Sequence, residues 1–150
     1  MLDAKDRFHH ALGRMIGMTR KSLRNRLQKI LSERGYDVTA EQLIVICNLW
    51  DREGMNQRQI SEILDNNKTS TVRMIDGLEK RNLAVRVPDK TDRRQNMIYL
   101  THEGKSLCPK LMKVVDQMHE EALKGISKNR LMACKEVLEI IMNNLAKLEN

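Results

Sequence analysis

The chain has 150 residues, a length typical of one domain, and a formal net charge of +7. Hydrophobic residues make up 41% of it and aromatic residues only 3%, so the core has to be built from aliphatic side chains and methionine. Seven glycines and two prolines argue against a loop-rich β fold and favour helices. No apolar run is long enough to span a membrane, and charged residues interrupt the N-terminus where a signal peptide would be apolar, so we expect a cytoplasmic protein.

Positive charge is concentrated in two blocks of the chain. Residues 1–34 carry a net charge of +6 and residues 56–101 carry +3, whereas residues 35–55 carry −3. A basic surplus favours a polyanionic partner, although a solubilising surface charge explains the composition equally well.

Two helices are predicted in the first third of the chain. The first covers residues 4–34, where apolar side chains recur at helical spacing, and Gly35 ends it because glycine adopts the left-handed cap at little cost. Thr39 and Gln42 have the spacing of a capping box, which opens a second helix from Leu43 to about Trp50. This second helix is apolar nearly all round, so we expect it to be central and buried.

Two shorter helices joined by a tight turn come next. Asn56 is suited to cap the first, and residues 65–67 are of the types that form turns. The second runs over residues 68–81 and ends at Asn82, which takes the place of a capping glycine. This is the layout of a helix-turn-helix, in which the second helix enters the major groove of DNA.

A hairpin with a charged tip follows. Its strands are predicted at residues 84–87, where Pro88 ends the first, and 97–100, and the eight residues 89–96 between them are all polar or charged. Two adjacent arginines, Arg93 and Arg94, lie in this tip, and arginine is suited to the negative potential of a narrow minor groove. A solvated charged turn is the alternative interpretation.

Two long helices complete the chain. Thr101 is suited to cap the first, in which Pro109 should produce a kink, and Ser127 is suited to cap the second. The second helix has apolar residues at alternating spacings of three and four, which is the pattern of a helix-pairing seam: Leu131, Cys134, Leu138, Ile141, Leu145 and Leu148. The fold class expected is mainly α with a small β-wing: a winged helix-turn-helix lobe at residues 38–101, with dimerisation helices at residues 1–34 and 102–150 of the same domain.

The candidate DNA-binding residues lie in the helix-turn-helix and the hairpin. Arginine can bond guanine in a bidentate manner, and serine or threonine can bond several base edges or phosphates, so we expect specificity from Thr69, Ser70 and Arg73. An ordinary solvated polar face is the alternative. Gly77, which is unfavourable inside a helix, would allow either close approach to the groove or close packing. The full candidate set is Gln57, Arg58, Asn67, Lys68, Thr69, Ser70, Arg73, Arg93 and Arg94.

The same residues resemble a known family. The run from Leu78 to Leu83, the Asp92-Arg93-Arg94 segment, and Leu100-Thr101 followed by Glu103-Gly104 are similar to the MarR-type winged-helix regulators. The resemblance spans essentially the whole chain. It departs from the family pattern at Asn82, where glycine is frequent, and at Ile60-Ser61, where Leu-Ala is common.

The resemblance implies a homodimer built from the terminal helices, with two DNA-binding lobes. It implies that Arg94 enters the minor groove and that Asp92 is its supporting acid. Members of this family often bind small anionic, frequently phenolic effectors, and others sense oxidants through a cysteine in the first helix or sense metal ions. This chain has no cysteine in its first helix.

The sequence predicts neither an enzyme nor a metal or cofactor site. No nucleophile–base pair or pair of carboxylates stands out, and the four histidines lack the spacing of metal ligands. The three cysteines, Cys47, Cys108 and Cys134, are far apart, form no disulfide framework, and lie in apolar helical patterns, so we expect them in the core.

The sequence-based hypothesis is a homodimeric regulator of transcription that binds a pseudo-palindromic operator in double-stranded DNA, acts as a repressor, and is released by a small effector. Three rivals remain. The first is a basic dimer that binds nucleic acid without sequence preference, and the second is a small-molecule enzyme or carrier that uses the dimer pocket. The third is a membrane-surface role for the basic first helix, whose apolar face is better explained by dimer packing.

Overall fold

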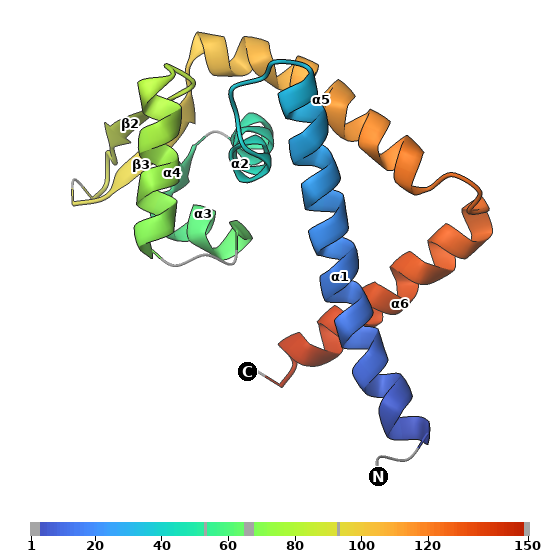
Figure 1. Cartoon of the computed structure of the whole chain (residues 1–150). Coiled ribbons are helices and arrows are strands. Elements are labelled where there is room, and N and C mark those ends of the chain that lie inside the picture. The colour runs from blue at the N-terminus through green and yellow to red at the C-terminus, as the bar shows by residue number, and fades with distance from the viewer. Residues whose placement is uncertain (1–3, 53, 65–67, 93, 149–150) are drawn as a thin grey trace. The chain divides into compact units, whose positions relative to one another are not determined.

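The computed structural model describes residues 4–52, 54–64, 68–92 and 94–148, with side chains from residue 11 onward. The chain divides into two compact units, Met1–Met118 and His119–Asn150, and each is described by itself. The mainly α fold with a small β-wing is confirmed (Figure 1), with elements in the order α1 (Ala4–Glu33), α2 (Ala40–Asp51), β1 (Met55–Asn56), α3 (Gln57–Leu64), α4 (Lys68–Lys80), β2 (Ala84–Pro88), β3 (Asn96–Leu100), α5 (His102–Ala122) and α6 (Lys128–Ala146).

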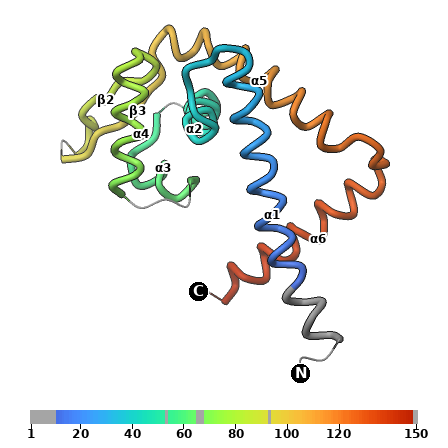
Figure 2. The backbone as a smooth tube through the Cα atoms, viewed as in Figure 1, coloured from blue at the N-terminus to red at the C-terminus, as the bar shows by residue number. Residues whose placement is uncertain are grey.

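Helix α1 is one uninterrupted helix (Figure 2). Burial changes along its length from residue 11 onward. Its last turns contribute Leu27, Ile30 and Leu31 to the core, whereas every side chain from residue 11 to residue 22 is exposed. The helix ends as predicted at Gly35, which has a φ of 72°. The N–H of Tyr36 donates to the carbonyl of Leu31 at 2.9 Å and closes the cap.

Helix α2 begins with the predicted capping box. Thr39 Oγ1 accepts from the Gln42 N–H at 3.1 Å, and Gln42 Oε1 accepts from the Thr39 N–H at 3.0 Å. The helix therefore starts at Ala40, earlier than the apolar run suggested. The expectation that it is buried all round was wrong: Trp50 is 50% exposed and Ile44 is 36% exposed, because neighbouring elements cover only part of its circumference.

The helix-turn-helix is formed by α3 and α4. Asn56 caps α3 through a second capping box: its Oδ1 accepts from the Gln59 N–H at 2.9 Å, and its own N–H donates to Gln59 Oε1 at 2.8 Å. A hydrogen bond of 2.9 Å between the hydroxyls of Ser61 and Thr71 joins the two helices and satisfies the fully buried Thr71. The predicted turn at residues 65–67 lies outside the described residues.

The wing is the hairpin of β2 and β3, in a three-stranded antiparallel sheet of order β1-β3-β2. The hairpin register pairs Ala84 with Leu100 and Pro88 with Asn96. Asn82 has a φ of 55°, which confirms its predicted place as the cap of α4. Strand β1 was not predicted, because two residues are too short to show an alternating pattern.

Helix α5 starts against the base of the wing. Thr101 Oγ1 accepts from the Gly104 N–H at 3.0 Å, as expected of a cap. A Cβ on Gly104 would lie 2.1 Å from the carbonyl oxygen of Leu83, so only glycine fits at this approach. The helix continues through Pro109 and contributes a row of buried side chains to the lobe: Cys108, Leu111, Val114 and Met118.

The unit that contains α6 has an uncovered helix. Ser127 caps α6 as predicted, and none of the residues of this helix is buried. Its predicted seam is therefore open, with Leu131 39% exposed and Leu145 56% exposed. The expectation of a core position was wrong for Cys134, which is exposed. No helix of the described residues is both long enough and apolar enough to cross a membrane.

Candidate nucleic-acid interface

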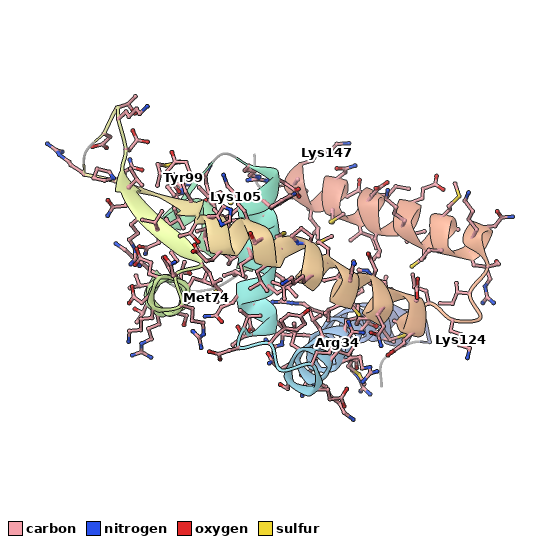
Figure 3. All side chains as sticks on the ribbon, turned by 90° about the horizontal axis from the view of Figure 1, so that it is seen from above. Arg34, Met74, Tyr99, Lys105, Lys124 and Lys147 are labelled. Carbon is pink, nitrogen blue, oxygen red and sulfur yellow. The ribbon has the colours of Figure 1, made fainter. Side chains whose placement is uncertain are left out.

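The exposed face of α4 holds most of the predicted base-reading residues. Lys68, Thr69, Ser70 and Arg73 are all exposed at the start of the helix. The opposite face is packed: Thr71, Ile75 and Leu78 are buried, and the view along α4 shows Met74 on the side that faces the rest of the lobe (Figure 3). Asn67, also predicted to bind DNA, lies outside the described residues.

The arginine at the wing tip is oriented through its backbone. Asp92 Oδ1 accepts from the Arg94 N–H at 3.0 Å, and its Oδ2 accepts from the side-chain amide of Gln95 at 3.1 Å. Asp92 therefore contacts Arg94 through the backbone of that residue. Between described residues, the guanidinium groups of Arg73 and Arg94 form no salt bridge, so their charge is available to a ligand. Arg93 lies outside the described residues.

A second acid, missed in the sequence, organises the same tip. Asp89 Oδ1 accepts from the Thr91 hydroxyl and the Thr91 N–H, both at 2.6 Å, and from the Asp92 N–H at 3.0 Å. These bonds, the hydroxyl of Thr91 first, hold the pKa of the Asp89 carboxyl below its ordinary value. The Asp-x-Thr spacing is the signal that could have revealed this turn. Asp89 thus ties Thr91 and Asp92 together by hydrogen bonds within the chain.

Arg86 joins the wing to α4. Its guanidinium forms ion pairs with Glu79 and, at 2.8 Å, with Asp76, and its backbone N–H donates to Glu79 Oε1 at 3.0 Å. The side chain of Arg86 is only 25% exposed, so these bonds are partly shielded from water. Arg86 therefore holds the hairpin against α4, a role that could not be assigned from the sequence.

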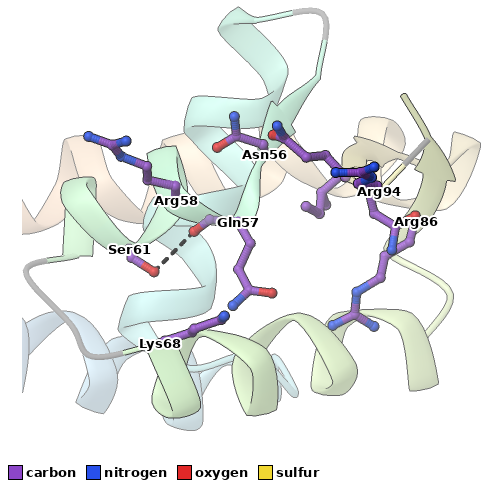
Figure 4. Close-up of a pocket in the computed structure, with 10 residues that line it drawn as sticks. Asn56, Gln57, Arg58, Ser61, Lys68, Arg86 and Arg94 are labelled. Carbon is purple, nitrogen blue, oxygen red and sulfur yellow. Dashed lines mark hydrogen bonds between the residues drawn. The ribbon is translucent and has the colours of Figure 1, made fainter. Parts of the chain in front are cut away.

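A hollow of about 550 Å³ lies between the helix-turn-helix and the wing (Figure 4). It brings together four of the predicted residues, Gln57, Arg58, Lys68 and Arg94, and no described residue that lines it is acidic. The positive charge of Arg58 is partly matched by Glu62 at 2.9 Å, but both side chains are well exposed and the pair is weak. The remaining lining residues are Asn56, Ser61, Arg86, Gln95, Asn96 and Ile98.

Gly77 is explained by packing within the lobe. A Cβ at this position would lie 2.8 Å from the side-chain nitrogen of Gln42 and 3.3 Å from Arg81. The oxygen of the same Gln42 amide completes the capping box of α2, so its position is restricted. The alternative prediction, in which Gly77 faces the DNA groove, is not needed.

The far end of α4 is held by an exposed ion pair. The guanidinium of Arg81 donates to both carboxylate oxygens of Asp37, at 2.8 Å and 3.1 Å. These hydrogen bonds and the positive charge of Arg81 lower the pKa of the Asp37 carboxyl. Arg81 thus has an acidic partner within the chain and is not available to a ligand in the way that Arg94 is.

The described residues offer no group of three His, Cys, Asp or Glu side chains that could hold a metal ion. Their buried side-chain nitrogen and oxygen atoms all have hydrogen-bond partners. The candidate site is the basic, exposed surface formed by the start of α4, the hollow and the wing tip.

Part of this chain is similar in sequence to a known family. Residues 38–95 match the model of the MarR family. The multiple antibiotic resistance protein MarR of Escherichia coli is 25% identical over 132 residues, which cover 87% of this chain and 90% of that protein. Its sequence match thus extends well beyond the lobe.

Two solved structures share the fold. The crystal structure of a MarR transcriptional regulator from Methanosarcina mazei has a TM-score of 0.81 at 24% identity, covering 93% of this chain and 99% of that one. A cysteine-to-serine mutant of E. coli MarR complexed with operator DNA has a TM-score of 0.79 at 23% identity, with the same coverage of 93% and 99%. Residues 38–95 thus match the MarR family model, and the two solved structures share the fold of this chain.

Proposed function

We propose that this protein is a sequence-specific, double-stranded DNA-binding regulator of transcription, a homodimer that represses from a pseudo-palindromic operator. The observation that carries the proposal is the exposed basic surface formed by the start of α4 and the wing tip. The proposal places the protein in the cytoplasm, where its DNA would be, and assigns it no enzymatic activity.

The recognition helix is α4 in this proposal. Thr69, Ser70 and Arg73 are exposed on the same part of the helix, and their opposite face is fixed to the core. A helix in the major groove presents its N-terminal residues to base edges. Arg73 would read guanine, and the two hydroxyls would read neighbouring edges or phosphates.

The wing and the hollow supply the contacts that do not depend on sequence. Lys68, Arg58 and Gln57 line the basic hollow, which suits the phosphate backbone. Arg94 lines the same hollow, has its backbone N–H bonded to Asp92, and would enter the adjacent minor groove. The E. coli MarR mutant of the same fold is complexed with operator DNA, which supports this mode of binding.

The homodimer is proposed from the apolar surfaces of the terminal helices. No residue of α6 is buried, and the first half of α1 is exposed from residue 11 onward, although both carry apolar residues at helical spacing. A second copy would cover these faces and give a two-fold arrangement. Two recognition helices in successive major grooves lie about 34–36 Å apart, so the site should be a pseudo-palindrome.

Control by a small anionic or phenolic effector is the last part of the proposal, and it rests on the family resemblance. An effector that binds more tightly to a dimer with the wrong spacing of lobes would shift the population away from the DNA-binding form.

The direct experiment is the selection of bound sequences from a random duplex pool. We expect enrichment of one palindromic family, and loss of that enrichment in the presence of a matching effector. A protein that binds the selected duplex and a shuffled duplex equally would support the rival of non-specific nucleic-acid binding. Failure to enrich any palindrome would overturn the proposed function.

A further inference from the structure

Three sulfur atoms meet where α2 contacts α5. The Sγ of Cys47 on α2 lies 3.3 Å from the Sδ of Met112 on α5. Cys108 lies one turn before Met112 on the same helix, close enough that Cys47 and Cys108 each affect the pKa of the other thiol. Two thiols and a thioether from distant parts of the sequence therefore form one cluster, which we call the sulfur cluster.

The cluster is enclosed on one side and reachable on the other. Cys108 is 1% exposed and Cys47 is half-buried, whereas Met112 is 41% exposed. A small solute can thus reach the sulfur atoms past the methionine side chain. The donors are all soft, and thiolate and thioether ligands select soft cations such as Cu(I) over the hard cations that oxygen ligands prefer.

We propose that the sulfur cluster, formed by Cys47, Cys108 and Met112, is a binding site for one soft monovalent cation of the Cu(I) and Ag(I) class. Formation of one metal–thiolate bond at Cys47 releases one proton to solvent and cancels the single positive charge of the ion. The sulfurs of Cys108 and Met112 complete a three-sulfur shell around a neutral centre. A neutral centre suits a half-buried position, where an uncompensated charge would be costly.

Oxidation of the same thiols is the less favoured chemistry. Burial raises the pKa of Cys47 to about 12 and also raises the pKa of Cys108. Both groups are therefore thiols near neutral pH, and the thiol is a poor nucleophile towards oxidants. The negative charge of Asp51, which contributes to raising the pKa of both groups, would favour a bound cation.

The test uses the native, fully reduced chain and silver nitrate in chloride-free buffer, so that no reductant is required. Alkylation with iodoacetamide in mildly alkaline buffer, run long enough to label Cys47 despite its raised pKa, is read by peptide mass spectrometry. It compares Cys47 with the exposed Cys134 before and after one equivalent of Ag(I). We expect the labelling of Cys47 to fall at least tenfold and that of Cys134 to stay unchanged. Loss of labelling at Cys134 with Cys47 still reactive would overturn the proposal.

Variants give an independent measurement by calorimetric titration. We expect one tight site in the native chain and in Cys134→Ser, the matched control. Cys47→Ser should weaken binding at least 100-fold, and Met112→Leu, which keeps the volume but removes the sulfur, about tenfold. Equal affinity in Cys47→Ser and the native chain would contradict the site.

Cys108 is buried, so a substitution there could disturb folding. A spectroscopic measurement on the native chain avoids this difficulty. X-ray absorption of the native chain with one equivalent of Ag(I) or ascorbate-maintained Cu(I) should show three sulfur neighbours. A first shell of nitrogen or oxygen, or a single sulfur, would overturn the proposal.

Discussion

The lobe and the terminal helices of this chain bury their apolar side chains to very different extents. Between residues 27 and 118, side chains from the end of α1, from α2 to α5 and from the sheet form one core, in which Ile46, Ile75 and Leu111 are fully buried. Along α6 and residues 11–22 of α1, apolar residues recur just as regularly but remain largely exposed. The periodicity of apolar residues is therefore the same in both parts, and what differs is whether the chain itself supplies the partner.

The difference separates two kinds of stability. The lobe has its partners within one chain, so it should fold at any protein concentration. The terminal helices have apolar faces that only another surface can cover, and in the proposed homodimer their stability depends on concentration. The predictions that follow are substitutions that should affect one part and spare the other.

The largest effect is expected at Gly104, at the start of α5, where the helix packs against the lobe. In Gly104→Ala the new Cβ would lie 2.1 Å from the Leu83 carbonyl oxygen, and the backbone has to move. We expect the free energy of unfolding to fall by about 4 kcal/mol, measured by urea denaturation. Ser106→Ala, at an exposed position of the same helix, is the control and should change little. An equal effect of both substitutions would show that the contact with the Leu83 carbonyl is not the reason for glycine at position 104.

A large effect on assembly is expected from the α6 seam. Leu138→Glu places a charge in the centre of the apolar face without removing any buried residue of the chain. Burial of each of the two Leu138 side chains would stabilise a dimer by about 1.5–3 kcal/mol, and the substitution removes both contributions. The dissociation constant of the dimer should therefore rise at least about 100-fold. Sedimentation equilibrium measures it, and Lys135→Gln on the same helix is the control. A dimer that is unchanged in Leu138→Glu would place the interface elsewhere.

A moderate effect is expected where the wing meets α4. Arg86→Gln removes the ion pairs with Glu79 and Asp76 while the lobe keeps its apolar core. Because Arg86 is partly exposed, the free energy of unfolding, measured by urea denaturation, should fall by only about 1–2 kcal/mol. Arg58→Gln removes a pair that is 88% and 61% exposed and serves as the control, with a change near zero. If both variants unfold alike, Arg86 does not anchor the wing.

Most of the helical fold could be predicted because helices reveal themselves through local patterns. The caps at Thr39, Asn56 and Ser127 are set by residues three apart in the sequence, and the structure confirms each of them. Contacts between distant residues left no such pattern. Gly104 is required by the carbonyl of Leu83, and Gly77 by the amide of Gln42, and neither pairing can be read from spacing.

The cysteines show the limit of the pattern most clearly. Cys47, Cys108 and Cys134 all lie in apolar helical stretches, and each was expected in the core. Only Cys108 is fully buried, because its helix packs against the lobe, whereas Cys134 lies on the uncovered face of α6. Local sequence thus predicts which face of a helix is apolar, but the identity of its partner decides the burial.

The sequence indicates which residues of the candidate site are exposed, but it does not reveal the residues that hold the wing in place. The structure exposes Lys68, Thr69, Ser70 and Arg73 together at the start of α4. The groups that orient the wing were found only in three dimensions, since the ion pairs of Arg86 join two elements. The hydrogen bonds of Asp89 depend on the fold of the tip.

The salt dependence of DNA binding by Arg94→Ala tests the central claim most directly. Each arginine that neutralises a phosphate or enters a groove releases counterions, so the slope of log affinity against log salt should fall by about one unit, with a loss of about 1 kcal/mol. Arg81→Gln, at the other end of α4 and already paired with Asp37, is the control and should keep the native slope. A slope that is the same in Arg94→Ala and the native protein would contradict the assignment of the wing to the DNA interface.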